Sequence, residues 1–460
     1  MSKQRKIPFF TATLTLLVFL GIAAYMIIVL HAEPHIPMIA GVAIVGAVAM
    51  GYGASWKDIE DGMVEGMTKA LSACTILFLI GLLIGSWINA GVVPSLIYYG
   101  VKALSPKNFL VGCLLLCSAI SMTLGSWGTA GTIGIALISI SHILGIPPAL
   151  TAGAIISGAY FGDRVSPITD MSNLLSAVTE QDIMQVIKKS LPLNLIGLGI
   201  ASVVFYYLGK PYWNGVMGTE VDHLVGLLQD QFYLGLICLV PLVLLLVCIL
   251  VKIPAIPSIF VGIVSSGVFA VVVQHRSLES VLSCCFFGYS SNTGNQVIDS
   301  LLSTGGIESM QYSVSLALVA MMLGGVMEKT GIVDSFMNPL IGKLKRKGDL
   351  SAAVVASTLA VNVVLPDAYV ALALPGRMFG GVYKQHQVSQ LELSRALGSG
   401  AISLSPIIPW NACGVFMATV LGVSVAEYAP FCILNYIVAV GAIVFGYLDK
   451  PPVHRRKVTT

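Results

Sequence analysis

The chain consists mainly of long apolar runs separated by short polar stretches. A helix needs roughly 20 apolar residues to cross a bilayer, and eight runs approach or exceed that length. They cover residues 9–30, 35–53, 69–89, 191–209, 232–252, 256–273, 311–330 and 428–448. This pattern predicts an all-α polytopic membrane protein.

Four further apolar regions are interrupted by polar or helix-breaking residues. The regions 148–178 and 398–423 each contain a Ser-Pro sequence, and we expect each to form a broken helix. The regions 108–145 and 351–385 each have two apolar arms around a small polar centre. We expect these two to form opposed re-entrant hairpins, which enter and leave the membrane on one side.

The two halves of the chain resemble each other weakly but in the same order. With a shift of 240 residues Gly85 falls on Gly325, and with a shift near 239 Ser166-Pro167-Ile168 falls on Ser405-Pro406-Ile407. The hairpin regions correspond as well. We therefore predict four parts, which are a first repeat over 1–210, a polar linker over 211–231, a second repeat over 232–450 and a basic cytoplasmic tail over 451–460.

Charge supports a lipid-facing surface and suggests an orientation. Only 10% of the residues are charged, against about 25% in a soluble domain. With re-entrant hairpins and about ten transmembrane helices, most Lys and Arg residues lie on the side of both termini, which the positive-inside rule makes cytoplasmic. The corresponding loops 102–107 and 343–347 then face opposite sides, so the repeats are predicted to be inverted.

Several function classes find no support. The chain has no Walker-type phosphate loop, no GxSxG and no HExxH, so we expect neither ATP-driven transport nor an enzyme. Its nine cysteines include no CxxC spacing, so we expect no metal cofactor. Basic residues gather only near loop ends, which argues against nucleic-acid binding. The expected partners are the lipid bilayer and transported solutes.

The first predicted break carries the strongest candidate chemistry. Charges at membrane depth are costly and usually functional, and unwound backbone offers carbonyls to Na⁺. A carboxylate that Na⁺ and H⁺ share produces exchange, because protonation expels the ion. We favour Asp170 for this role and then Asp163; the alternative for Asp163 is a structural pair with Arg164. The candidates in this break are Asp163, Arg164, Ser166, Thr169, Asp170, Ser172 and Asn173.

The second break and the two hairpin centres contribute fewer candidates. The second break has no carboxylate but offers Ser405 and Asn411, and Asn411 joins Asp163 and Asp170 as a candidate Na⁺ ligand. Asp367 lies at the centre of the second hairpin, where it either faces the site or caps the helix that follows. At the first hairpin centre the candidates are Ser126 and Thr129.

Two arginines keep an organic anion among the candidate substrates. Arg164 and Arg377 both lie in segments predicted at membrane depth, and either guanidinium suits a substrate carboxylate. For Arg377 the alternative is that its side chain reaches back to the cytoplasmic interface.

Three motifs together resemble the NhaC-type Na⁺/H⁺ antiporter family. They are Phe161–Asp170, Ser291-Asn292-Thr293-Gly294-Asn295 and Leu404–Gly414, and Gly125–Thr129 is similar to the family too. The resemblance adds Asn292 and Thr293 to the site candidates. It also implies inverted repeats, a dimeric scaffold and an elevator motion. The chain departs from the family at Met171, where a threonine is common.

The expected function is therefore Na⁺/H⁺ antiport. The alternatives are a Na⁺/H⁺-coupled organic-anion exchanger, similar to the malate/lactate exchangers among the family's relatives, and an amino-acid carrier. We expect a multi-pass homodimer in the inner (plasma) membrane of a prokaryote, with both termini cytoplasmic and with Na⁺ and H⁺ as transported ions.

Overall fold

The computed structural model describes residues 6–30, 32–103, 105–213, 218–251, 253–295, 298–299, 302–337, 346–365 and 367–448. Every regular element in these ranges is a helix, and none of these residues forms a strand. The all-α prediction is thus confirmed for the described chain. The predicted tail over 451–460 lies outside the described residues.

The elements of the first half run from α1 to η2. They are α1 (Phe9–Ile28), α2 (His35–Gly51), α3 (Trp56–Asn89), α4 (Val92–Ala103), α5 (Phe109–Thr129), η1 (Ala130–Gly134), α6 (Ile135–Ile143), α7 (Pro148–Val165), α8 (Asp170–Thr179), α9 (Ile183–Gly209) and η2 (Lys210–Tyr212).

The elements of the second half run from α10 to α22. They are α10 (Gly218–Gln231), η3 (Leu236–Leu239), α11 (Val240–Leu250), α12 (Ala255–Val272), α13 (Leu278–Phe287), α15 (Gly306–Lys329), α16 (Ile332–Met337), α17 (Lys347–Val364), α18 (Ala368–Gln385), α19 (Gln390–Leu397), η5 (Gly398–Ile402), η6 (Ser405–Ile407), α20 (Ala412–Leu421), α21 (Val425–Tyr428), η7 (Ala429–Phe431) and α22 (Ile433–Leu448).

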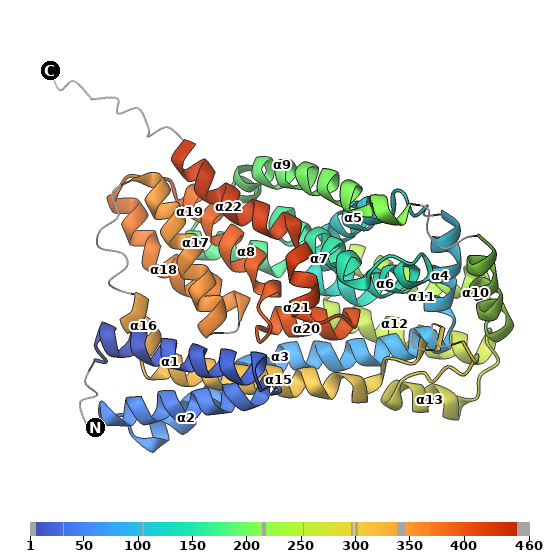
Figure 1. Cartoon of the computed structure of the whole chain (residues 1–460), viewed down its shortest axis with the longest axis horizontal. Helices are drawn as coiled ribbons and strands as arrows, with labels where there is room; N and C mark the ends of the chain where they lie inside the picture. Colours follow the sequence, from blue (N-terminus) through green and yellow to red (C-terminus); the bar gives the residue numbers. More distant parts are fainter. Residues whose placement is uncertain are drawn as a thin grey trace.

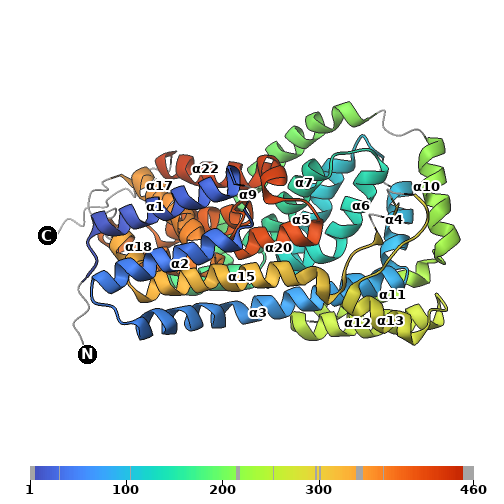
Figure 2. The same ribbon diagram turned by 60° about the horizontal axis from the view of Figure 1, so that its bottom comes forward.

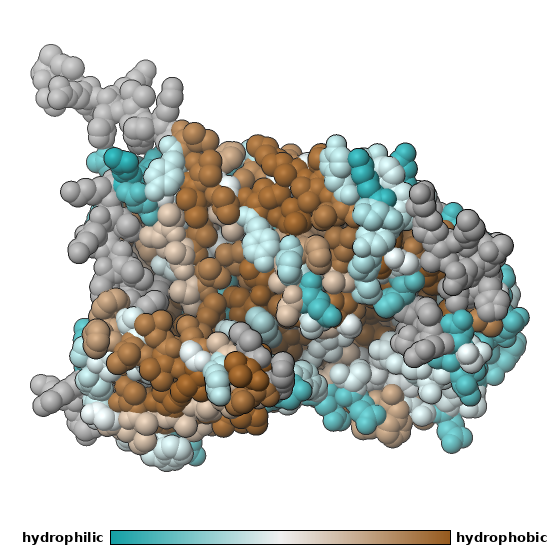
Figure 3. Space-filling model, viewed as in Figure 1, coloured by the Kyte–Doolittle hydropathy of each residue, from teal (hydrophilic) through white to brown (hydrophobic). Residues whose placement is uncertain are grey.

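Several helices are long and apolar enough to span a bilayer. Within the described residues there are six, or up to nine if each of three sharply bent helix pairs counts as one span. The outer surface suits lipid, since Phe10, Val203 and Val440 are 76%, 56% and 61% exposed. Figure 3 shows broad apolar areas over α1, α9 and α22 on one face. These features indicate an integral membrane protein.

The helices α3 and α15 form a long antiparallel pair beside the other helices (Figures 1 and 2). The helix α3 begins at Trp56, well before the apolar run predicted from residue 69. Ser55 starts it with a capping box, in which the side chains and backbone N–H groups of Ser55 and Asp58 bond reciprocally. The first turns of α3 are polar, so a search for apolar residues alone predicts the start of this helix too late in the sequence.

The segment predicted as a polar linker is largely helical where it is described. It comprises η2 and α10, and α10 contacts α4. The region after residue 276 contains the short helix α13 and the loop that follows. The division into repeats and linker stays a prediction.

The two predicted hairpin regions each contain an interruption. In the first, Gly125 has φ 69° and ψ 178° inside α5, a conformation that favours glycine. In the second, α17 and α18 are separated near Asp367. The first region pairs closely with α7, and the second with α8 and α19, so both regions lie against a broken helix.

Candidate functional site

The first predicted break lies between α7 and α8. Pro167 disfavours helical geometry at the residue before it, and Ser166 is extended at φ −106° and ψ 133°. The Ser166 hydroxyl donates to the Met122 carbonyl at 2.5 Å and accepts from the Ile168 N–H at 3.2 Å. Ser166 therefore fixes the unwound turn and ties it to α5.

The other polar side chains of this break satisfy its free carbonyls. The Asp163 carbonyl accepts from the Ser172 hydroxyl at 2.7 Å and from the Thr169 hydroxyl at 3.2 Å. The Asn173 amide donates to the carbonyls of Thr169 at 2.9 Å and Pro167 at 3.2 Å. Because both hydroxyls give their proton to backbone, their oxygen lone pairs stay available to a cation.

Asp163 is the buried carboxylate of the site. It is only 5% exposed, and its Oδ1 accepts from the backbone N–H of Ser126 at 3.1 Å. A Cβ at Gly125 would stand 3.3 Å from the same oxygen, so glycine permits this close approach. The interruption in α5 thus brings Ser126, a candidate from the sequence, into contact with the end of α7 through its backbone N–H.

Thr129 does not complete this contact. Its hydroxyl donates to the Gly125 carbonyl at 2.8 Å, one turn earlier in the same helix. It thereby caps a carbonyl at the interruption rather than facing Asp163. Trp127 stacks on Phe416 of α20, with ring centroids 4.1 Å apart, so the interruption in α5 also lies beside the second broken helix.

Arg164 crosses from the first broken helix to the second. It is 3% exposed, and its Nη1 donates to the Ser403 hydroxyl at 2.6 Å. Its Nε donates to the Tyr160 carbonyl at 3.1 Å. The described hydrogen bonds of Asp163 and Arg164 therefore go to other partners, which differs from the structural pair considered above. Sequence reasoning missed Ser403, although the repeat shift of 239 aligns it with Arg164.

Asp170 occupies a different environment from Asp163. It is the first residue of α8 and is exposed, and Thr169 precedes it as the N-cap. A carboxylate in the first turn stabilises a helix N-terminus, which gives Asp170 a structural role beside any ionic one. Its exposure suits contact with ions arriving from water better than a dehydrated site.

The second predicted break separates η6 from α20, and the two helical parts are bent by 47°. Asn411 is fully buried; its Oδ1 accepts from the Cys413 N–H at 3.0 Å and so caps α20. Its amide donates to Oδ1 of Asn362 at 3.1 Å. Ser405 donates to the Ile402 carbonyl at 2.9 Å, within its own segment.

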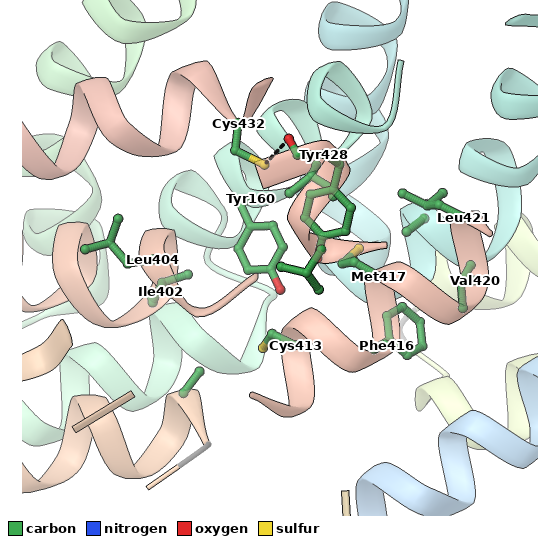
Figure 4. Close-up of a cluster of buried hydrophobic side chains, with 14 of the residues drawn as sticks. Tyr160, Ile402, Leu404, Cys413, Phe416, Met417, Val420, Leu421, Tyr428 and Cys432 are labelled. Carbon is green, nitrogen blue, oxygen red and sulfur yellow. Dashed lines mark hydrogen bonds between the residues drawn. The ribbon is translucent and has the colours of Figure 1, made fainter. Parts of the chain in front are cut away.

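Aromatic hydroxyl and indole groups hold the rest of this break. The Trp410 indole donates to the Val363 carbonyl at 2.7 Å, and the Tyr428 hydroxyl donates to the Pro406 carbonyl at 2.6 Å. In Figure 4 the Tyr160 hydroxyl points toward Cys413, so α7 and α20 meet here. Sequence reasoning missed Asn362, which lies in α17 and has no motif of its own.

Asp367 caps a helix, as the sequence alternative allowed. Its Oδ1 accepts from the Val370 N–H at 2.8 Å at the start of α18. This bond fixes the carboxylate at the helix N-terminus. Its role in ion binding stays a prediction.

Asn292 and Thr293 belong to a separate loop. The Thr293 hydroxyl and N–H donate to Asp299 at 2.8 Å and 2.7 Å, and the Asn292 carbonyl accepts from Gln231 at 3.4 Å. These contacts hold the pKa of Asp299 below its usual range, the Thr293 N–H contributing most. These hydrogen bonds hold the loop together and tie it to α10.

Arg377 lines a pocket of about 270 Å³ between two groups of helices. Lys69 of α3 and Glu328 of α15 form one wall, with their charged groups 2.6 Å apart. Arg377 and Tyr369 of α18 line the other. Arg377 is exposed, and its Nε donates to the Ala373 carbonyl at 3.4 Å, so most of the guanidinium is available to a solute.

Comparison with known proteins gives matches along nearly the whole chain. A model of the Na⁺/H⁺ antiporter family matches residues 6–210 and 158–450. The Na⁺/H⁺ antiporter NhaC of Alkalihalophilus pseudofirmus is 34% identical over 97% of both chains. NhaC of Bacillus subtilis is 33% identical over 98% of this chain and 100% of that protein. The malate-2H⁺/Na⁺-lactate antiporter of B. subtilis is 34% identical over 89% of this chain and 87% of that protein.

Proposed function

The chain belongs to the Na⁺/H⁺ antiporter family, and we propose that it exchanges Na⁺ for H⁺ across a prokaryotic plasma membrane. Na⁺ and H⁺ are then its transported ions, and it needs no resident cofactor. The observation that carries the proposal is the buried Asp163 carboxylate, which lies where α7 ends beside the interruption in α5.

The chemistry of exchange follows from competition for this carboxylate. Bound Na⁺ stabilises the charged form, whereas a proton neutralises it and removes the attraction for the ion. The hydroxyls of Thr169 and Ser172 lie at the adjacent carbonyl and supply hard oxygen ligands. Asp163 therefore takes precedence over Asp170 as the exchanging group, because Asp170 is exposed.

The test uses everted vesicles from cells that lack their own Na⁺/H⁺ antiporters. Added Na⁺ should dissipate an imposed pH gradient with the wild-type protein, and Asp163→Asn should abolish this. Asp230→Asn is the matched control, since Asp230 is an exposed carboxylate of α10. If added Na⁺ left the pH gradient of wild-type vesicles unchanged, the proposed function would be wrong.

Inverted repeats form part of the proposal, and the contacts between α3 and α15 support them. Gly66 packs against Met321, and Gly81 packs against Gly306. Gly66 and Gly306 are 240 residues apart, and so are Gly81 and Met321. The counterpart of Gly66 is therefore Gly306, and the counterpart of Met321 is Gly81. The two contacts are equivalent under this correspondence, as a two-fold axis between the repeats requires.

The membrane arrangement is also part of the proposal. It comprises about ten crossings, two re-entrant hairpins, cytoplasmic termini and a homodimer. The excess of Lys and Arg on one side supports the orientation. Reporter fusions after Gly209 and after Leu448 test it, since the two points should report opposite sides of the membrane.

A second candidate function is coupled exchange of an organic anion. The pocket at Arg377 supports it, because Arg377 and Lys69 outnumber Glu328 there and favour a carboxylate over Na⁺. Amino-acid transport is the further variant. Uptake of labelled malate or lactate into proteoliposomes, lost in Arg377→Gln but kept in Lys188→Gln, would favour this function; equal uptake by both variants would remove Arg377 from it.

A further inference from the structure

We propose that Arg164 is a positioning residue that serves as the fixed counter-charge of the exchange site and is held in place by the opposite repeat. The inference rests on the proposed function and concerns how the site is stabilised in the state in which no ion is bound. Three observations carry it, which are the burial of Arg164, the origin of its anchor and its place next to Asp163.

The anchor comes from the second half of the chain. Ser403 is fully buried and accepts Nη1 of Arg164 at 2.6 Å. Its carbonyl in turn accepts the Asn435 amide of α22 at 2.8 Å, so Ser403 is itself fixed. Arg164 and Ser403 are 239 residues apart, which is the repeat shift. Arg164 and Ser403 are thus repeat counterparts that touch each other. Two such residues must lie beside the two-fold axis that relates the repeats, and both broken helices come together there.

The guanidinium has donor groups beyond the one that bonds to Ser403. Nε donates to the Tyr160 carbonyl at 3.1 Å, while Nη2 is buried and has no hydrogen-bond partner within the described part of the chain. An arginine has five N–H donors in a rigid fork, and the unused ones retain their full field in a site of low dielectric. The charge therefore acts on its surroundings, above all on the neighbouring Asp163.

Exchange requires a state in which one cation has left before the other arrives. A bare buried carboxylate is costly, and a nearby fixed cation offsets that cost. Arginine keeps its proton at every physiological pH, so it stabilises the empty site without becoming the transported proton. The same charge repels Na⁺ and prevents the site from holding it too firmly. Arg164 thereby lowers the affinity of the site for Na⁺ and raises the rate at which Na⁺ is released.

The experiment measures Na⁺-driven proton movement in proteoliposomes at a series of Na⁺ concentrations. Arg164→Gln should lower both the KM for Na⁺ and kcat, each by about tenfold, because Na⁺ is then bound more tightly and released more slowly. Arg164→Lys should recover part of kcat, since it restores the charge without the fork. Lys188→Gln, which removes an exposed cation of α9, is the control and should match the wild type.

Ser403→Ala keeps the test decisive if Arg164→Gln fails to fold. It removes only the anchoring hydroxyl and should change KM and kcat in the same direction by a smaller factor. A merely structural role would lower the amount of folded protein and leave KM unchanged. An unchanged or raised KM in Ser403→Ala, with a working wild type, overturns the inference alone; a wild type that moves no protons in response to Na⁺ rejects the proposed function instead.

Discussion

The two broken helices use the same backbone device but very different side chains. The first, between α7 and α8, contains Asp163, Arg164 and Asp170. The second has no charged residue over 398–423, around the break that separates η6 from α20, and is held there by Asn411 and neighbouring neutral groups. Although both breaks contain a Ser-Pro sequence, only the first has carboxylates beside it that can change their charge during a cycle.

The difference indicates a division of labour. A neutral, hydrogen-bonded break is stable without a bound ion, whereas a charged one depends on ions and protons to balance its charge. The second break then acts as a fixed frame, and through Ser403 it orients the charged residues of the first. Each of the following predictions tests one side of this contrast.

The largest expected effect follows from removing the buried charge. Asp163→Asn should lower Na⁺/H⁺ exchange by about 100-fold or more, because its amide cannot alternate between proton and ion. Asp170→Asn should retain kcat and raise the KM for Na⁺ only severalfold, since Asp170 is exposed. Steady-state exchange in proteoliposomes measures both. The reverse order of effects would make Asp170 the exchanging group, as the sequence alone suggested.

Removing the central amide of the second break should act on stability. Asn411→Ala deletes the cap of α20 and leaves Asn362 with an unpaired buried group, which costs about 1–3 kcal/mol. Thermal unfolding in detergent should shift to lower temperature, while the exchange rate per folded molecule stays far above that of Asp163→Asn. Complete loss of exchange in a folded Asn411→Ala protein would instead place Asn411 at the ion.

The two Ser-Pro serines offer a matched pair of substitutions. The Ser166 hydroxyl donates to a carbonyl of α5, whereas the Ser405 hydroxyl donates to the Ile402 carbonyl three residues earlier in the chain. Ser166→Ala should therefore destabilise the protein by about 1 kcal/mol more than Ser405→Ala does. Equal shifts in thermal unfolding would show that the two hydroxyls have equivalent structural roles.

Two substitutions of Asp367 distinguish a helix-capping role from an ion-binding role. Asp367→Asn preserves a good N-cap and should leave exchange and stability near the wild type, while Asp367→Ala should lose about 1 kcal/mol. Thermal unfolding together with vesicle exchange distinguishes the two. Loss of exchange in Asp367→Asn would add this carboxylate to the ion site.

The smallest effect is expected at the loop of Asn292 and Thr293. Thr293→Val removes a hydrogen bond to Asp299 and should loosen the loop, because the hydroxyl and N–H of Thr293 converge on that carboxylate. Exchange should stay within about twofold of the wild type, since the described hydrogen bonds of Asn292 and Thr293 to Gln231 and Asp299 lie within the loop and its contact with α10. A strong loss of exchange would connect this loop to transport.

Sequence reasoning found the fold class and both breaks because they leave local signals. Apolar runs mark helices, and Ser166-Pro167 and Ser405-Pro406 mark their interruption. It ranked Asp170 above Asp163 because burial cannot be read from a motif. It also missed Asn362 and Ser403, whose roles depend on partners about 50 and 239 residues away. Such contacts arise from packing, and only the repeat shift hinted at the second.

The most direct test measures uptake of radioactive sodium into proteoliposomes with an acidic lumen. The wild-type protein should accumulate sodium as protons leave, uptake should stop when the pH gradient is dissipated, and Asp163→Asn should show neither accumulation nor proton release. Sodium accumulation at the wild-type rate by folded Asp163→Asn protein would contradict the central role of the buried carboxylate.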